Sequence, residues 1–283
     1  MFQHIIKVFI HQNYSVMIDK FKEFLEQGNM SKNTIEAYIY AVNAFFNQYK
    51  VVNKKNLLAH KSYLIEKFKP KTVNLRIQAL NKFLDFSGKK KLRLKSVKVQ
   101  QRSFLENVIS NADYTFLKNE LKKEDNKMWY FVVRFLAATG ARVSELIQIK
   151  AEHVFAGYFD LYTKGGKVRR LYIPKKLQEE TVIWLKGSLR NSGYLFLNRF
   201  GERITTRGIS QQLKKYAEKF GLNPKVVYPH SFRHRYAKNF LDKFNDISLL
   251  ADLMGHESIE TTRIYLRRTA SEQKEIVDKI ITW

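Results

Sequence analysis

The 283-residue sequence contains no cysteine, so it can form neither a disulfide framework nor a thiolate metal site. It also lacks any run of about 18 apolar residues, the length that a helix needs to span a bilayer. The N-terminal stretch FQHIIKVFI is interrupted by Gln3, His4 and Lys7 and has no small-residue cleavage site, which is atypical of a signal peptide. These absences predict a cytoplasmic protein without a membrane segment and with little dependence on cofactors.

Acidic residues are scarce relative to basic ones. Asp and Glu total 26 against 51 Lys and Arg, which gives a formal net charge of +25 and a pI near 10.0. Such an excess opposes compaction by self-repulsion unless a polyanion neutralises it. Hydrophobic residues make up 45% of the chain, a proportion typical of folded proteins. Composition therefore predicts a globular protein of two domains, whose partner is nucleic acid rather than a membrane surface.

Helical periodicity predicts a small N-terminal domain over residues 1–88. A first helix is expected over residues 14–27 and ends at Gly28, while residues 1–13 receive no assignment. A second helix is expected to begin at Asn33, whose side chain would cap it while Glu36 completes a capping box. A third helix should cover residues 53–68, and a fourth should run from Pro70 to Gly88. The predicted domain is a four-helix unit with lysine-rich exposed faces.

The stretch GKKKLRLKSVKVQQRS, residues 88–103, carries seven basic residues and no acidic one. Because a block of like charges repels itself and remains extended, we predict a linker over residues 89–103. A solvated linker and a strap along a DNA backbone are both compatible with this composition. The basic residues expected to contact DNA here are Lys89, Lys90, Lys91, Arg93 and Lys95.

Beyond the linker, the pattern is again mainly helical. Asp113 is expected to cap one helix, and MWYFVVRFLAATG predicts a buried helix that ends at Gly140. Arg142 and Glu145 follow, three residues apart, at the start of the next helix. An arginine at this position is costly to bury without an anion or a carboxylate partner. From these residues alone, an Arg142–Glu145 ion pair is favoured over a phosphate site.

Residues 158–174 interrupt the helical pattern with a hairpin. The β-prone runs YFDLYT and VRRLYIP flank KGGK, whose two glycines supply the positive φ of a tight turn. Lys164 and Lys167 lie at the two shoulders of this turn, which by itself is an ordinary exposed loop. Further helices are expected over residues 175–186, 206–220, 230–241, 246–254 and 271–281, with a short strand at 194–197. The last helix has a narrow apolar stripe and should dock on another surface.

The stretch from Pro229 to Leu266 concentrates residues suited to phosphate chemistry. His230 and Arg233 are three apart, so on a helix they share one face and can reach one anion. Guanidiniums clamp phosphate oxygens, a histidine can accept a proton from a hydroxyl and a lysine can donate one. A tyrosine becomes a nucleophile where cations stabilise its phenolate. The set that suits phosphoryl transfer without metal comprises Arg142, Lys164, His230, Arg233, His256 and Tyr265.

No cluster of carboxylates suited to Mg²⁺ and no Walker glycine loop is found in the sequence. We therefore predict neither a metal nor a nucleotide cofactor. The remaining histidines, including His234, share no spacing and are expected to play no part in the chemistry.

Five stretches in order resemble the conserved boxes of the tyrosine site-specific recombinases, also called the phage integrase family: ATGARVSEL, TKGGKVRRLYIP, HSFRHRYA, LMGHES and TTRIYL. The Xer-like and transposon-resolvase members are the most similar in length. The resemblance covers residues 104–283 and implies a mixed α/β catalytic domain there, with a C-terminal tail for subunit exchange. It also implies that residues 1–88 are the helical core-binding domain, so the expected fold is mainly α with a small antiparallel β-hairpin.

The resemblance implies a role for each matching residue. Tyr265 would attack the scissile phosphodiester, and Arg142 and Arg233 would bind the phosphate. His230 would be the general base, and His256 would form a hydrogen bond to the phosphate.

Three further residues have positions related to these boxes. Lys164 matches the general acid, with Lys167 as the alternative or as a DNA contact. Glu145 matches an acidic position that supports the first arginine. Arg235 lies beside a box and is expected either to contact the DNA backbone or to be an exposed arginine.

The implied reaction proceeds through a 3′-phosphotyrosine and a Holliday junction, in a homotetramer assembled through the tail on DNA with an inverted-repeat core site. The biological role would be resolution of DNA dimers or of transposon cointegrates, with integration or excision of a mobile element as the alternative. The requirement for accessory proteins stays open. A non-catalytic helix-turn-helix regulator would explain the charge and the helices, although it would not explain the six-residue set. The expected location is the nucleoid.

Overall fold

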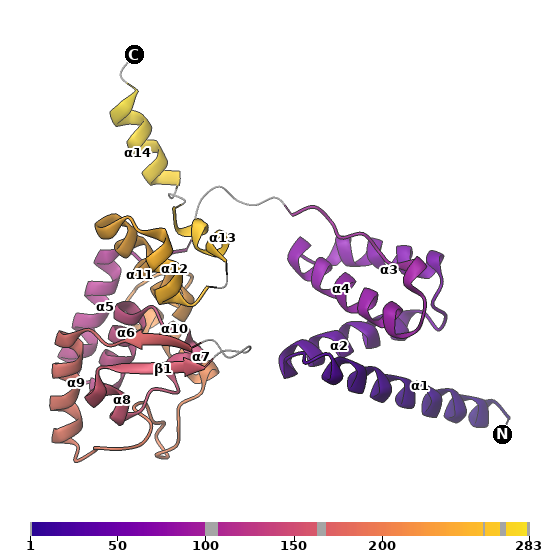
Figure 1. Ribbon diagram of the computed structural model, residues 1–283, viewed down its shortest axis with the longest axis horizontal. Helices are drawn as coiled ribbons and strands as arrows, with labels where there is room; N and C mark the ends of the chain where they lie inside the picture. The colour runs from indigo at the N-terminus through magenta and orange to yellow at the C-terminus, as the bar shows by residue number, and fades with distance from the viewer. Residues whose placement is uncertain (1, 100–106, 163–167, 257, 267–269, 282–283) are drawn as a thin grey trace. The chain divides into compact units, whose positions relative to one another are not determined.

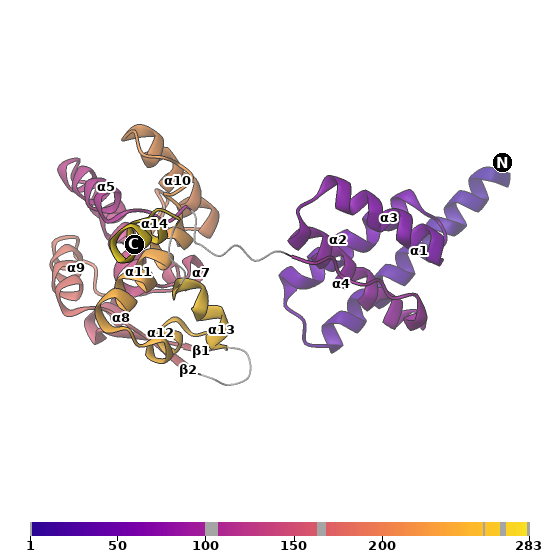
Figure 2. The ribbon, with the colours of Figure 1, turned by 90° about the horizontal axis from the view of Figure 1, so that it is seen from above.

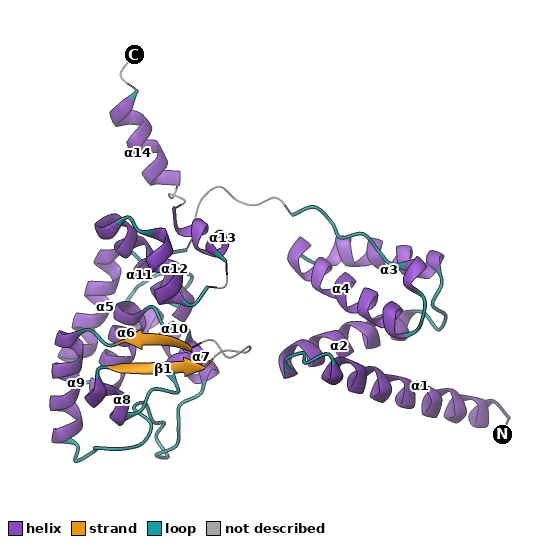
Figure 3. Cartoon of the chain, viewed as in Figure 1, coloured by secondary structure: helices purple, strands orange, loops and turns teal. Residues whose placement is uncertain are grey.

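The computed structural model describes residues 2–99, 107–162, 168–256, 258–266 and 270–281. The chain divides into two compact units, unit 1 from Met1 to Gln101 and unit 2 from Arg102 to Trp283. Helices dominate both units, and the described strands form one two-stranded antiparallel sheet in unit 2 (Figure 1, Figure 3). The predicted fold, mainly α with a small antiparallel hairpin, is therefore confirmed.

The described residues of unit 1 form four α-helices, as predicted from the periodicity. They are α1 (Phe2–Gln27), α2 (Lys32–Gln48), α3 (Lys54–Lys67) and α4 (Pro70–Phe86). Their apolar stripes meet in one core, in which Phe21, Phe45 and Leu80 are almost fully buried. The rings of Phe21 and Phe83 pack edge to face at 5.2 Å, so α1 and α4 are joined through aromatic side chains.

Two helix starts in unit 1 differ from the prediction. The first helix begins at Phe2 rather than at residue 14. The second begins at Lys32, because the hydroxyl of Ser31 accepts a hydrogen bond from the backbone N–H of Thr34 at 3.3 Å. The predicted capping box of Asn33 and Glu36 is therefore wrong. The third helix begins as expected, with Asn53 as its cap.

Residues 89–97 do not behave as the free linker that the charge pattern predicted. After a short 3₁₀ turn, η1 (Lys90–Leu92), Leu94 is buried in the core of unit 1. The side-chain amide of Asn81 on α4 bonds the backbone N–H and C=O of Leu94 at 2.8 and 2.9 Å, and Asn74 bonds those of Val97 at the same distances. Two asparagines thus satisfy the backbone N–H and C=O groups of Leu94 and Val97 in this extended stretch.

The basic side chains of this strap, residues 89–97, face away from the core. Lys89, Lys90, Lys91, Arg93 and Lys95 are all exposed. Arg93 forms a 2.8 Å ion pair with Asp85 on α4. The strap therefore holds its backbone against unit 1 and presents its cations to solvent.

Unit 2 surrounds the apolar helix α6 (Lys127–Thr139), on which Val132, Phe135 and Leu136 are fully buried. The helix packs against α5 (Asn111–Lys123), α9 (Lys175–Gly187) and α11 (Pro229–Phe244) (Figure 1), and Figure 2 shows these three partner helices from above. It ends at Gly140, which has a φ of 62° as predicted for its stop signal. The cap of α5 is Ser110 rather than the predicted Asp113, whose N–H donates to the Ser110 hydroxyl at 2.9 Å.

The remaining elements of unit 2 follow the predicted order. The hairpin pairs β1 (Tyr158–Tyr162) with β2 (Val168–Tyr172). The segment 194–197 forms only isolated bridges, so the predicted short strand there is wrong. The other elements are α7 (Val143–Leu146), α8 (Ala151–Ala156), α10 (Thr206–Lys219), α12 (Ile247–Met254), α13 (Ile259–Thr262), η2 (Arg263–Leu266) and α14 (Ala270–Ile280).

Candidate active site

Arg233 lies at the centre of the candidate site, with only 1% of its surface exposed. It projects from α11 and donates hydrogen bonds to the carbonyl oxygens of Gly140 and Met254, which lie at the C-terminal ends of α6 and α12. Helix C-termini carry partial negative charge, so they stabilise a buried cation without neutralising it. Burial, followed by repulsion from Arg142, lowers the pKa of Arg233 to about 10, which leaves the guanidinium charged at neutral pH.

Arg142 precedes α7 and is held by Glu145, which confirms the predicted ion pair. Its Nη1 donates to Glu145 Oε1 at 2.8 Å, and its backbone N–H donates to Oε2 at 2.7 Å. Its Nη2 donates to the carbonyl of Gly255 at 3.1 Å. Burial alone would raise the pKa of Glu145, but Arg169 and Arg142 outweigh it and hold the pKa below its ordinary value. Glu145 is therefore an ionised support for an arginine that remains partly open to solvent.

His256 follows Gly255, whose left-handed φ of 60° ends α12. Its Nε2 lies 2.9 Å from a guanidinium nitrogen of Arg233, and its Nδ1 lies 2.8 Å from the Thr262 hydroxyl. Because a guanidinium can only donate, Nε2 must be the acceptor and Nδ1 must carry the hydrogen. Burial and the charge of Arg233 lower the pKa of His256 to about 4, which agrees with a neutral ring.

Tyr265 lies on η2 with 4% of its surface exposed, in a small apolar cluster with Leu250 and Met254. Its ring stacks at 6.0 Å on that of His256 and lies 5.2 Å from that of His234. Burial raises the pKa of Tyr265, while the charge of Arg233 and a hydrogen bond from it act in the opposite direction. The phenol is thus buried beside the cation best placed to stabilise its phenolate.

His230 lies one helical turn before His234, and their rings meet edge to face at 4.9 Å. Unlike Arg233 on the same helix, His230 is exposed, and with Arg142, Ser210 and Tyr228 it borders a hollow of about 250 Å³. Burial of part of the ring and the charges of Arg233 and Arg142 lower the pKa of His230. The imidazole is neutral at neutral pH and can accept a proton.

The structure therefore brings five of the predicted residues into one neighbourhood. The two lysines of the hairpin turn, Lys164 and Lys167, lie outside the described residues.

Two members of this neighbourhood were not predicted from the sequence. Arg169 on β2 is 7% exposed and donates to both oxygens of Glu145, at 2.8 and 2.9 Å. It shares its strand face with the buried Leu171, so the two-residue period of β2 could have indicated an inward arginine. His234, which was assigned no role, lies between the rings of His230 and Tyr265.

Arg235 differs from the exposed arginine that the sequence suggested. Its guanidinium carbon lies 3.9 Å from the centre of the Tyr114 ring, and the side chain is only partly exposed. This cation–π contact joins α11 to α5. A contact of Arg235 with DNA stays a prediction.

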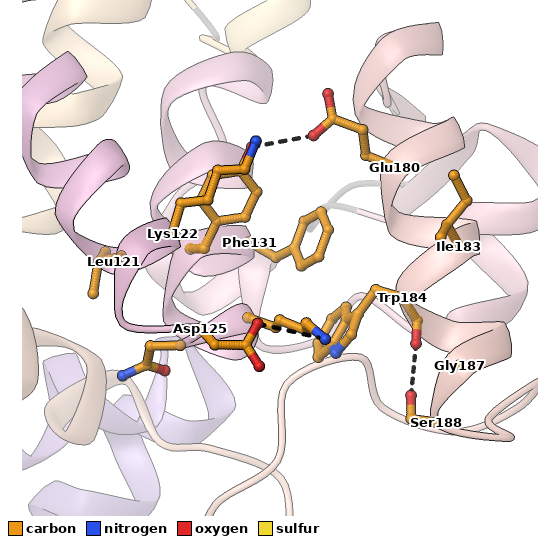
Figure 4. Close-up of a pocket in the computed structure, with 12 residues that line it drawn as sticks. Leu121, Lys122, Asp125, Phe131, Glu180, Ile183, Trp184, Gly187 and Ser188 are labelled. Carbon is orange, nitrogen blue, oxygen red and sulfur yellow. Dashed lines mark hydrogen bonds and ion pairs between the residues drawn. The ribbon is translucent and has the colours of Figure 1, made fainter.

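A second hollow, of about 580 Å³, lies between α6 and α9 and is separate from these residues. Figure 4 shows Phe131 and Trp184 in its wall, with rings stacked at 4.8 Å, and Glu180 at its edge. Glu180 accepts hydrogen bonds from Tyr130 and Arg134, which ties α9 to α6. No predicted site residue lines this hollow.

Metal-binding clusters and membrane-spanning helices are both absent from the described ranges. Within these ranges, no three histidine, aspartate or glutamate side chains are placed to hold a metal ion together. No helix among them combines the length and the apolar character of a membrane span.

Comparisons with known proteins agree with this geometry. The model of the phage integrase family matches residues 105–272. Tyrosine recombinase XerA of Pyrococcus furiosus is 30% identical over 277 residues, which cover 94% of each chain. TnP I resolvase of Bacillus thuringiensis is 25% identical and covers 87% of this chain and 93% of its own length.

Solved structures share the fold at low identity. The Tn1549 transposon integrase in complex with transposon right end DNA gives a TM-score of 0.70 at 15% identity, covering 93% of this chain and 99% of its own. A lambda integrase dimer bound to a COC′ core site also gives 0.70, at 16% identity, covering 89% of this chain and 76% of its own.

A helical fold that gathers two arginines and two histidines around a buried tyrosine defines a DNA strand transferase of the tyrosine recombinase class. The chain belongs to the phage integrase family, because the family model matches more than half of it and a 30% identical relative covers nearly all of it.

Proposed function

We propose that this recombinase acts at specific DNA sites through a covalent bond between Tyr265 and DNA. The phenolate oxygen of Tyr265 attacks the scissile phosphorus, the bond from phosphorus to the 5′ oxygen breaks, and a 3′-phosphotyrosine forms. The 5′-hydroxyl of a partner strand then attacks this ester and releases the tyrosine. Because each step replaces one phosphate ester with another, no ATP is needed.

The observation that carries this proposal is the contact of Tyr265 with Arg233 inside a group of buried cations. A phenol has an ordinary pKa of about 10 and attacks poorly until its anion is stabilised. Arg233 supplies fixed positive charge at the phenol, and Arg142 adds a second guanidinium that remains partly exposed. Together they can bind the non-bridging oxygens and offset the charge that grows in the transition state.

Proton transfer is assigned to groups at the edge of the same site. His230 has a lowered pKa and an exposed ring, so it can take the proton from Tyr265 as general base. Lys164 would donate a proton to the 5′ oxygen, with Lys167 as the alternative donor. When DNA enters, His256 would release Arg233, carry its ring hydrogen on Nε2 instead of Nδ1, and donate that hydrogen to the phosphate.

The partner is double-stranded DNA, which would neutralise the formal charge of +25. The exposed cations of the strap, Lys89, Lys90, Lys91, Arg93 and Lys95, are available to its backbone, and we add Lys167 and Arg235 as further contacts. We propose an inverted-repeat core site, a homotetramer and a Holliday junction, with the protein located on the nucleoid. Of the biological roles, dimer or cointegrate resolution is preferred to integration and excision.

Assembly of this tetramer is assigned to α14. Val277 and Ile280 on this helix and Ile281 just after it are all exposed, and a second copy of unit 2 would cover them. Truncation before Ser271 is expected to abolish cooperative binding in a gel-shift titration, and unchanged cooperativity would reject this assignment.

The test uses nicked duplexes that carry the inverted repeats flanking the coding region, so that cleavage traps the covalent complex. The wild-type protein should give a protein-linked strand that survives denaturation and that a chelator does not prevent. The Tyr265→Phe variant keeps the ring and its packing, so it should bind the same duplex without forming the link. A transcription regulator would show no link with either protein, and that outcome would reject the proposal.

A further inference from the structure

Arg169 on β2 is connected to the active site without being part of its surface. Its side chain is 6% exposed, and its Nη1 donates to Glu145 Oε1 at 2.8 Å and to Oε2 at 2.9 Å. Its Nε donates to the carbonyl of Leu253 at 2.8 Å, near the end of α12. Its hydrogen bonds go to Glu145 and Leu253 and, unlike those of Arg233, not to His256 or Tyr265, so its effect on the reaction passes through these protein partners.

The first of these partners is shared with Arg142. Oε1 of Glu145 accepts from Arg142 Nη1 and from Arg169 Nη1, both at 2.8 Å. Across the part of the chain that the structure describes, Glu145 is the one carboxylate that forms an ion pair with any of the arginines Arg142, Arg169 and Arg233. The group therefore keeps an excess of positive charge, which is what a phosphodiester and its more highly charged transition state require.

This sharing determines how much charge Arg142 offers to a ligand. A carboxylate paired with a single guanidinium would largely cancel its field, since two opposite charges at hydrogen-bond distance present little net charge beyond the pair. With Arg169 in place, the carboxylate of Glu145 still orients Arg142, but the negative charge of that carboxylate is divided between Arg142 and Arg169. Arg142 is the more exposed of the two, with 38% of its side chain accessible.

The second connection runs through Gly255. The stem of Arg169 packs so closely beneath it that a Cβ at Gly255 would lie 2.3 Å from Arg169 Cδ. The carbonyl of Gly255 accepts from Arg142 Nη2 at 3.1 Å, and His256 is the next residue. Arg169 thus supports from one side both the carboxylate and the carbonyl that hold Arg142.

We propose that Arg169 is a positioning residue that keeps Arg142 oriented and electrostatically available to the scissile phosphate. The inference rests on the proposed function, because it assigns Arg142 to phosphate binding. The proposal predicts that slower cleavage by an Arg169 variant results largely from the negative charge of Glu145, which then acts on Arg142 alone.

The experiment measures single-turnover cleavage of the nicked duplex, duplex affinity and thermal unfolding. Arg169→Met should cleave about 100-fold more slowly, the scale of loss that a small misplacement of a catalytic group produces. Its affinity for the duplex should change little, since the strap and the rest of the surface are intact. Arg170→Met is the matched control, because Arg170 on the same strand forms a two-bond ion pair with Asp160 that faces solvent. This control should cleave at the wild-type rate.

The double variant Arg169→Met/Glu145→Gln tests the mechanism itself. If Arg169 acts by dividing the charge of Glu145, removing that charge as well should make the double variant cleave faster than Arg169→Met. A purely structural role predicts a double variant no faster than Arg169→Met, because both changes break the same ion pair, and this result would overturn the inference. Wild-type cleavage by Arg169→Met would also overturn it.

Two further measurements separate the possible failures. If thermal unfolding shows that Arg169→Met is unfolded, Arg169→Gln takes its place, because it removes the charge and keeps an amide N–H that can donate a hydrogen bond. It should cleave more slowly than wild type and should become faster when combined with Glu145→Gln; a double variant that is no faster rejects the inference. A wild-type protein that gives no protein-linked strand rejects the proposed function and the inference with it. Normal wild-type cleavage combined with an unaffected Arg169→Gln variant rejects the inference alone.

Discussion

The two units of this chain bury different kinds of residue. Among the described residues of unit 1, the buried polar side chain is His60, and the rest of the interior is apolar. Unit 2 buries a larger polar set, namely Thr139, Arg169, Thr181, Ser231, Arg233 and Thr262. Apolar packing needs complementary shape, whereas a buried cation needs partners at defined distances. In unit 2, folding and chemistry therefore depend on the same side chains.

The strongest test of this comparison is the variant Arg233→Lys. A lysine has no planar fork, so it cannot reach Gly140, Met254 and His256 together. We expect cleavage of the nicked duplex to fall on the order of 100- to 1000-fold, the scale of losing one preorganised donor. Arg134→Lys is the control in the same unit, because Arg134 is mostly buried with Glu180 away from the site. Equal loss of cleavage in both variants would mean that cleavage depends on any buried arginine of unit 2, and not specifically on the contacts of Arg233 in the site.

A substitution in unit 1 should instead affect stability alone. Phe45 is 1% exposed and packs edge to face on Phe46 and His60. Phe45→Ala should destabilise unit 1 by about 3–5 kcal/mol, as for other large-to-small core changes. Hydrogen exchange on the whole chain should show faster exchange in α2 and α4 with unchanged protection of α6. Equal loss of protection in both units would show that they unfold together.

Acid should weaken both units, and unit 2 more. The pKa is lowered to about 4 for His60 in unit 1, and for His234 and His256 in unit 2, with burial as the largest cause each time. The unfolded chain binds protons below its ordinary histidine pKa of about 6.5, and the folded chain does not, so stability is complete above that pH and falls toward pH 4.

The expected loss is on the order of 1–3 kcal/mol for each histidine, nearer the lower value for the partly exposed His234 and His256. Hydrogen exchange at pH 7 and pH 5, corrected for the intrinsic exchange rate, measures both units in one sample. A free energy of unfolding that rises on acidification would contradict this pH dependence.

The smallest expected effect concerns the strap. Asn81→Ala removes both hydrogen bonds to Leu94 and should cost about 1–3 kcal/mol, the range for leaving buried backbone groups without partners. Loss of protection at the amide of Leu94 is the direct measurement. Asn74→Ala should release Val97 in the same way. Unchanged protection at both amides would mean that the buried Leu94 side chain alone holds the strap.

Local signals in the sequence located much of the fold and part of the site. The KGGK turn predicted the hairpin, Gly140 predicted the end of α6, and the spacing of Arg142 and Glu145 predicted their ion pair. Each of these features is determined by residues close together in the sequence, so a short sequence pattern is enough to predict it. The stretch from Pro229 to Leu266 placed Tyr265 in the candidate set, and the resemblance to recombinase boxes implied its role as the nucleophile.

Features that depend on contacts between residues distant in the sequence were not predicted. Leu94 is held by Asn81, and nothing in a basic stretch indicates that an amide on the preceding helix will pair with its backbone. Arg169 was not predicted because its partner Glu145 is distant in the sequence. The two-residue period of the strand nevertheless placed Arg169 on the buried face of β2. The cap of α2 was misplaced because Ser31 and Asn33 are both good capping residues, and tertiary packing selects between them.

The attachment of Arg233 to the ends of two helices has an evolutionary consequence. Its guanidinium joins the carbonyl of Gly140 to that of Met254, so the architecture of unit 2 needs it even when no reaction occurs. The hydroxyl of Tyr265, in contrast, can be removed while the ring still fills its cluster. A lineage that no longer needed strand exchange would be expected to lose the hydroxyl long before the arginine, and to persist as a silent DNA-binding protein.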